Sequence, residues 1–209
     1  MIHKPVYTLL KVCCNCSLVQ AAIDYEGCSD QNQCFGFPNG CINDKTCSIM
    51  TSLKISGENI DVKLMHLQYI TKDYAAMAFS DDQKMGKDLV FACSSGTGFW
   101  EVYAFWNPMN HTPPELLNKE LFKNPSGYYV GEIVTCKYTL EKDVTVKGTL
   151  FDFRKGYHIL LARGPAGAAT LNKHVDKIAS NHKFKYRTGR YIYNMYISTY
   201  NRLNYISIL

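Results

Sequence analysis

Several features that assign proteins to particular classes are missing from this 209-residue sequence. No apolar run approaches the roughly 18 residues that a membrane-spanning helix needs. The 14 glycines and 7 prolines are too few for a collagen-like or low-complexity chain. Charged residues make up 20% of the chain and hydrophobic residues 46%, which is typical of a globular protein. The net charge of +5 is too mild to indicate nucleic-acid binding by itself.

The common catalytic signatures are also missing. The sequence contains no zinc-protease HExxH motif, no glycine-rich phosphate loop and no recognisable order of Ser, His and Asp nucleophile partners. The chain therefore has no independent catalytic motif, and whether it forms part of an oxidoreductase is left open by the sequence. Any redox chemistry would have to come from a cofactor that the protein binds.

Cysteine, in contrast, is abundant, with nine residues that are unevenly placed. Three lie within the first twenty residues, and the other six are an even number. The middle group of four has no CxxC pair and no histidine at zinc-finger spacing, which argues against zinc and for disulfides. The sequence leaves the pairing open, and the last two cysteines are expected to pair with each other or one of them with the N-terminal group. The disulfide candidates are Cys28, Cys34, Cys41, Cys47, Cys93 and Cys136.

A disulfide framework indicates an extracellular or secretory-pathway location. Residues 1–23 begin with a short basic stretch, continue with moderately apolar residues and end in small ones, so they are expected to be a leader or signal segment, although Lys11 interrupts the apolar part. The alternative is a chain whose true start lies elsewhere. Asn110 begins an Asn-His-Thr sequon and is a glycosylation candidate.

The pattern of apolar residues predicts an all-β chain. Residues 24–47 are rich in Gly, Asn, Asp and Cys, and they are expected to form a cross-linked N-terminal cap without regular structure. Short runs rich in Val, Ile, Tyr and Phe follow, and turn residues separate several of them, which favours an antiparallel sandwich or barrel. Short helices are expected only at 113–121 and 171–179. The predicted strands are 48–56, 60–68, 74–80, 88–94, 99–106, 132–140, 145–153 and 157–164.

The segment 180–209 differs in character from the rest of the chain, with many tyrosines, several Lys and Arg and no Asp or Glu. Basic residues interleaved with aromatics suit single-stranded nucleic acid in principle. An exported, disulfide-linked domain rarely meets nucleic acid. We therefore interpret this basic, Tyr-rich tail as an extension outside the domain, and no nucleic-acid partner is expected.

Three stretches point to a known family. They are the cap, with CFGFPNGC at 34–41; YAAMAFSDDQKMGKDLVFAC at 74–93, followed by FWEVYAFWNP; and YHILLARGPAGAATLNKH at 157–174. Together they resemble a DOMON domain of the ferric-chelate reductase and stromal-cell-derived receptor type. The resemblance runs from about residue 25 to about residue 176 and implies an immunoglobulin-like antiparallel β-sandwich with a disulfide-rich N-terminal cap, over residues 24–179.

The resemblance also implies a ligand pocket at one end of the sandwich. In electron-transferring members this pocket is a haem b site with Met and His axial ligands. It implies an extracellular domain acting in one-electron transfer, with ascorbate, a ferric chelate or a transmembrane b-type cytochrome unit as partner. Such a unit, or a missing C-terminal part, would associate the domain with the membrane. The alternatives are a non-redox module that binds a sugar or a protein, and a purely structural fold that is a fragment of a larger membrane reductase.

The candidate axial ligands are Met85 and His174, which occupy the family's methionine and histidine positions. A His/Met pair raises the reduction potential of haem iron. Gly86 would let the backbone approach a flat macrocycle closely. Because the sequence has no CxxCH, attachment would be non-covalent. Met85 as an ordinary loop residue and His174 as an ordinary surface residue are the alternatives.

Other residues invite a functional interpretation with less support. Asp81 and Asp82 could face a cation, but such a pair more often forms a turn. His66 and His158 lie within predicted strands and are expected to be structural. Four aromatic residues are candidates for the pocket walls, although strand aromatics are more often core. They are Phe79, Trp100, Phe105 and Trp106.

Overall fold

The computed structural model describes residues 22–28, 32–68, 70–109 and 112–185. The sequon at Asn110, nearly all of the predicted leader and most of the basic tail lie outside the described residues, so these expectations stay predictions. The predicted domain limits of 24 and 179 stay predictions as well. Core packing does extend to Phe184, which forms a bridge with Tyr157.

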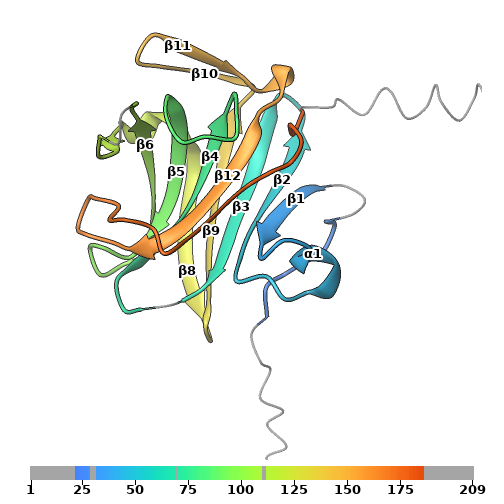
Figure 1. Ribbon diagram of the computed structural model, residues 1–209, viewed down its shortest axis with the longest axis vertical. Helices are drawn as coiled ribbons and strands as arrows, with labels where there is room; N and C mark the ends of the chain where they lie inside the picture. Colours follow the sequence, from blue (N-terminus) through green and yellow to red (C-terminus); the bar gives the residue numbers. More distant parts are fainter. Residues whose placement is uncertain (1–21, 29–31, 69, 110–111, 186–209) are drawn as a thin grey trace, which may run out of the picture.

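The described residues form two antiparallel sheets packed face to face, as Figure 1 shows, and this confirms the predicted β-sandwich. The apolar faces of the two sheets turn toward each other and form the core between them. The five-stranded sheet has the order β1 (Asn32–Phe37), β2 (Ile49–Ser56), β3 (Asn59–Leu67), β9 (Ile133–Glu141) and β8 (Lys123–Val130). The six-stranded sheet has the order β13 (Asp176–Ala179), β12 (His158–Pro165), β4 (Asp73–Ser80), β5 (Asp88–Ser94), β6 (Glu101–Asn107) and β7 (Glu115–Leu116). The hairpin is β10 (Asp143–Val146) with β11 (Thr149–Asp152).

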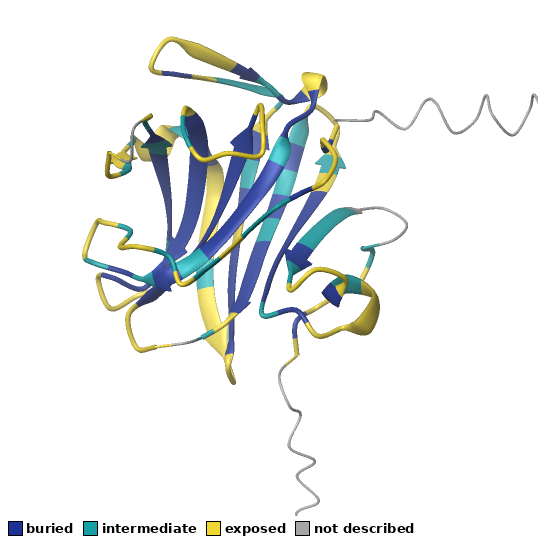
Figure 2. Cartoon of the chain, viewed as in Figure 1, coloured by how far each residue is buried: buried dark blue, intermediate teal, exposed yellow. Residues whose placement is uncertain are grey.

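Strand β4 is buried on both of its faces along its whole length (Figure 2). Successive strand residues point to opposite faces. Met77 and Phe79 therefore join the core between the sheets, whereas Tyr74, Ala76 and Ala78 belong to a second apolar cluster on the outer face of the six-stranded sheet. This outer face is not a bare solvent surface, and the candidate site lies over it.

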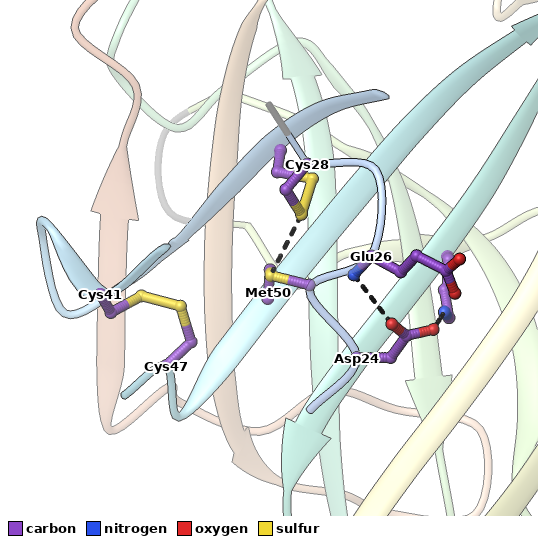
Figure 3. The surroundings of a disulfide bond; sticks show 8 residues. Asp24, Glu26, Cys28, Cys41, Cys47 and Met50 are labelled. Carbon is purple, nitrogen blue, oxygen red and sulfur yellow. Dashed lines mark hydrogen bonds and ion pairs between the residues drawn. A yellow bond between two sulfur atoms is a disulfide. The ribbon is translucent and has the colours of Figure 1, made fainter. Parts of the chain in front are cut away.

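The N-terminal cap is held by two disulfides, Cys28–Cys34 and Cys41–Cys47 (Figure 3). Gly36 packs directly under the second bridge, since a Cβ added there would lie 2.6 Å from the Cys47 sulfur. The expectation that the cap has no regular structure is wrong. β1 pairs with β2 along its full length, and a short helix α1 (Cys41–Asp44) follows. No helix in the described ranges is long and apolar enough to cross a bilayer.

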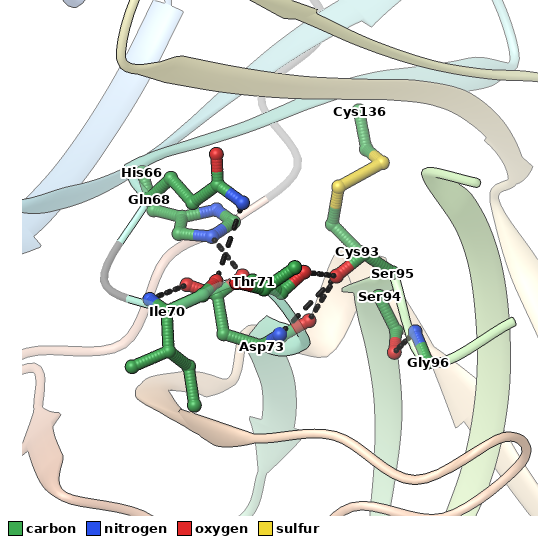
Figure 4. Close-up of polar contacts among 10 residues, drawn as sticks. All are labelled: His66, Gln68, Ile70, Thr71, Asp73, Cys93, Ser94, Ser95, Gly96 and Cys136. Atoms are coloured by element: carbon green, nitrogen blue, oxygen red, sulfur yellow. Dashed lines mark hydrogen bonds and ion pairs between the residues drawn. A yellow bond between two sulfur atoms is a disulfide. The ribbon is translucent and has the colours of Figure 1, made fainter. Parts of the chain in front are cut away.

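The third disulfide, Cys93–Cys136, joins β5 to β9 and so ties the two sheets together through the core. Both cysteines are fully buried. Of the two alternatives predicted for these cysteines, they pair with each other rather than with the N-terminal group. All six candidate cysteines are bonded. Figure 4 shows this bridge together with the polar contacts around Asp73.

Both predicted helices are absent. Residues 113–121 contain the two-residue strand β7 and a single 3₁₀ turn, η1 (Lys119–Leu121), in which the Asn118 side chain accepts a hydrogen bond from the Glu120 amide. Residues 176–179 form β13, which pairs with β12 from Leu160 to Arg163. An available strand edge satisfies these backbone groups and overrides the local helical propensity.

Two further strand assignments need correction. The predicted strand 145–153 is not a single strand. It spans the end of β10, the turn and all of β11, and both turn residues, Lys147 and Gly148, have positive φ angles. Strand β8 was not predicted, because its Asn-Pro-Ser-Gly sequence is typical of a turn. It forms the edge of the five-stranded sheet and has a register shift between Lys123 and Ser126, which places its proline where an edge tolerates one.

Candidate functional site

A cleft of about 320 Å³ lies over the outer face of the six-stranded sheet. Its floor is formed by Ala76, Val90 and Ala162, whose small side chains leave room above the sheet. The volume is within the range of small-molecule and cofactor sites. The sequence placed the pocket at one end of the sandwich, whereas the structure places this cleft over a sheet face. The remaining lining residues are Tyr74, Met85, Asn107, Pro108, Thr112, Pro113, Pro114, Leu171, Asn172, Lys173 and His174.

Met85 reaches the cleft from the loop between β4 and β5. Its neighbours on both sides are held by hydrogen bonds. The Lys84 amide donates to Asp82 Oδ1 at 2.7 Å, and the Gly86 amide donates to Asp88 Oδ2 at 2.6 Å. The Met85 side chain itself is 49% exposed, so its own packing does not fix it. Its position depends on the anchored backbone.

His174 reaches the cleft from the connection between β12 and β13. The Asn172 amide donates to the Pro165 carbonyl at 3.1 Å, and the Val175 amide donates to the Arg163 carbonyl at 2.8 Å. Gly164 allows this close approach, because a Cβ added there would lie 2.9 Å from the His174 Cα. The histidine segment therefore lies directly against β12.

The two segments approach the cleft from opposite ends of the sheet. The loop that carries Met85, called the methionine loop below, follows Ser80 at the end of β4. Ser80 pairs with the first residue of β12, His158. The histidine segment packs on Gly164, which is near the last residue of β12 and pairs with Tyr74. Two residues 89 positions apart in the sequence, Met85 and His174, thus line one cleft.

The cleft is cationic where His174 lines it. Lys173 also lines this part, and no carboxylate is found among the described residues that line the cleft. Burial lowers the pKa of His174, and the nearby Lys177 and Lys173 lower it further. The imidazole is therefore neutral near pH 7, which is the form that binds metals. Desolvation raises the pKa of Tyr74 to about 12, and its hydroxyl donates to the Asn172 carbonyl at 3.0 Å.

The aromatic residues named as candidate walls are not in the cleft. Phe79 belongs to the core between the sheets, and Trp100 and Trp106 pack against that core. Phe105 belongs to the outer apolar cluster but does not line the cleft. The aromatic lining residue is Tyr74, which sequence analysis missed. Its position at the start of a continuously buried strand was the available signal.

The acidic pair of the loop forms a turn, as the more frequent alternative predicted. The Asp82 side chain accepts a hydrogen bond from the Lys84 amide, and the Asp81 carboxylate lies 4.0 Å from the Lys183 ammonium. No group of three or more His, Cys, Asp or Glu suited to a metal ion occurs in the described part of the chain.

The strand histidines are structural. His158 Nδ1 contacts the Ser180 carbonyl at 2.8 Å. His66 is fully buried, with Nε2 3.4 Å from Asp73 Oδ1 (Figure 4). It also packs edge-on against Trp100. Neither lines the cleft.

The residues of the cleft fit a flat, largely apolar group that carries iron. A thioether and an imidazole line the same space, and His/Met is an established axial pair for haem. The alanine floor and the prolines at 108, 113 and 114 supply apolar surface. Lys173 supplies a positive charge for carboxylates at the edge of such a group.

These features define a disulfide-linked β-sandwich domain with a cleft on one sheet face. The chain belongs to the DOMON domain family, whose match covers residues 45–164, more than half of its length. This confirms the resemblance found in the sequence.

Three relatives place the chain more closely. It is 29% identical over 145 residues to the putative ferric-chelate reductase 1 homolog of Drosophila melanogaster, a match that covers 67% of this chain and 22% of the relative. It is 28% identical over 159 residues to the mouse DOMON domain-containing protein FRRS1L, covering 74% of this chain and 51% of the relative. The human FRRS1L protein is 27% identical over the same coverage. The chain thus spans about a fifth to about half of these relatives.

A solved structure shares the fold. The cytochrome domain of Myriococcum thermophilum cellobiose dehydrogenase superposes with a TM-score of 0.50, covering 80% of this chain and 89% of that domain. The sequence identity is 6%, so this similarity bears on the fold alone.

Proposed function

We propose that this chain is an extracellular, haem-b-binding DOMON domain that takes part in one-electron transfer. The observation that carries the proposal is that Met85 and His174, from opposite ends of a sheet, line a single cleft. Similarity to a ferric-chelate reductase homolog and a fold shared with a cytochrome domain support it.

In this proposal Met85 and His174 are the residues that would hold the iron. When bound, haem would supply a ferric/ferrous couple, and a thioether ligand favours the reduced state. The prolines and alanines would exclude water from the apolar faces of the haem, and this burial would also tune its reduction potential. Lys173 would offer a positive charge to a carboxylate at the edge of the haem. The role of the protein would be to bind and orient the haem and to shield it from water.

The relatives suggest the partners. The name of one relative supports a ferric chelate as the electron acceptor. The family resemblance adds ascorbate or a transmembrane b-type cytochrome unit as the proposed donor or relay. Association with a membrane would come through such a partner or through a part of a longer protein outside this sequence. The disulfides agree with a location in the secretory pathway or outside the cell.

The test is the visible spectrum of the full chain reconstituted with haem b. We expect a shifted Soret band and a sharp α band on reduction, both of which are lost in a Met85→Ala, His174→Ala double variant. Met109→Ala and His182→Ala are matched controls, because Met109 is similarly exposed (52%) and neither residue lines the cleft. Wild-type protein without these bands would refute the proposal. Glycan binding that survives loss of both ligands would favour a non-redox module.

A further inference from the structure

We propose that Asp88 is a positioning residue that holds Met85 in ligating geometry through the Gly86 amide. The inference rests on the proposed haem site, and it names a residue that does not line the cleft. Asp88 is the first residue of β5 and is 1% exposed.

The contacts of Asp88 connect the methionine loop to the far wall of the cleft. Its Oδ2 atom accepts hydrogen bonds from the Gly86 amide at 2.6 Å and from Asn107 Nδ2 at 3.3 Å. Gly86 follows Met85 directly, and Asn107 lines the cleft. One oxygen of the Asp88 carboxylate therefore holds both Gly86, the residue after Met85, and Asn107, the last residue of β6 before the cleft-lining Pro108.

The loop needs such an anchor because its own conformation is strained. Gly86 has φ = 141° and Lys87 has φ = 60°, and a lysine rarely adopts the latter. On the other side of the methionine, the Ser80 hydroxyl donates to the Lys84 carbonyl at 3.3 Å. Met85 thus lies between two residues whose main chains are held by hydrogen bonds, while its own side chain is half exposed.

A structural role alone does not account for a carboxylate at this position. Burial raises the pKa of Asp88, while hydrogen bonds from Gly86 and Asn107 favour its ionised form. Burying an acid that is not paired with a cation is costly, whereas an apolar residue at a strand start is not. What the carboxylate provides is a strong acceptor for the amide next to the ligand.

The experiment uses the full chain and compares Asp88→Ala and Asp88→Asn with the control Asp152→Ala. Asp152 also accepts a hydrogen bond from a main-chain amide two residues away, that of Arg154, but it lies on the β10–β11 hairpin and makes no contact with the loop that carries Met85. The first readout is the exchange rate of the Gly86 amide in haem-free protein. The second is the long-wavelength sulfur-to-iron absorption band of the ferric haem complex, which reports methionine ligation.

We expect Asp88→Ala to speed exchange of the Gly86 amide by at least about tenfold, because a hydrogen bond to a charged group is lost. It should also abolish the sulfur band while haem stays bound through His174. Asp88→Asn keeps an acceptor oxygen and should preserve both signals, as should the control. Should Asp88→Ala fail to fold, Ser80→Ala removes the anchor at Lys84 with little loss of volume and should weaken the same band.

An Asp88→Ala protein with a protected Gly86 amide and an intact sulfur band would overturn the inference. Failure of the haem proposal looks different, because the wild type then shows no sulfur band at all. The exchange rate of Gly86 still decides in that case whether Asp88 anchors the loop.

Discussion

The Cys93–Cys136 bridge should contribute more to stability than either bridge of the cap. Its cysteines are separated by 43 positions, whereas those of Cys41–Cys47 are separated by 6. A bridge stabilises mainly by limiting the conformations of the unfolded chain, and this effect grows with the closed loop. The chain-entropy relation gives about 4 kcal/mol for the cross-sheet bridge and about 2 kcal/mol for the cap bridge.

The comparison is well matched, because all four cysteines are at most 3% exposed and lose similar packing when truncated. The difference between the two double variants, Cys93→Ala with Cys136→Ala and Cys41→Ala with Cys47→Ala, should therefore be about 1.7 kcal/mol, from loop length alone. Denaturant titration gives the free energy of unfolding of each variant. If the cap variant loses as much stability as the cross-sheet variant, or more, the loop-entropy reasoning is wrong for this fold.

Three further predictions concern the cleft. Gly164→Ala should push the His174 segment from β12 and lower haem affinity about tenfold or more, measured by titration. Tyr74→Phe loses the hydrogen bond to the Asn172 carbonyl and should lower the free energy of unfolding by about 1 kcal/mol; an unchanged value would contradict that bond. Because burial raises the pKa of Asp88 in the folded state, the folded carboxyl holds its proton more tightly than the unfolded one. Stability should therefore fall as the pH rises from about 4 through the raised pKa, and Asp88→Asn should remove that slope in pH-dependent unfolding.

The strands that the sequence predicted include those with strong β-formers, such as 99–106 and 132–140. Sequence patterns failed where the partner decided the structure. Residues 171–179 have no strand pattern, yet β13 forms because the edge of β12 is available to it. β1 lies in a segment rich in Gly and Asn, and it forms because β2 offers an edge next to two disulfides.

The location of the cleft was not accessible from the sequence. Ala76 and Ala162 lie within continuously apolar strands, where floor and core positions look alike. Met85 and His174 were proposed as ligands through family resemblance, because no local pattern separates a ligating methionine from an exposed one. Asp88 was missed because an acidic residue that starts a strand usually marks a turn.

The two sides of the cleft are held by different means, and this has consequences for tuning. The His174 segment lies on β12 through main-chain bonds and the close approach at Gly164, so a change there alters the sheet itself. Met85 depends on side chains, chiefly Asp88 and Ser80, which can be replaced without changing strand pairing. Changes at the proposed methionine ligand are therefore structurally easier than changes at the histidine. A DOMON domain can in this way keep its fold and cleft while the chemistry of the cleft changes at the methionine loop.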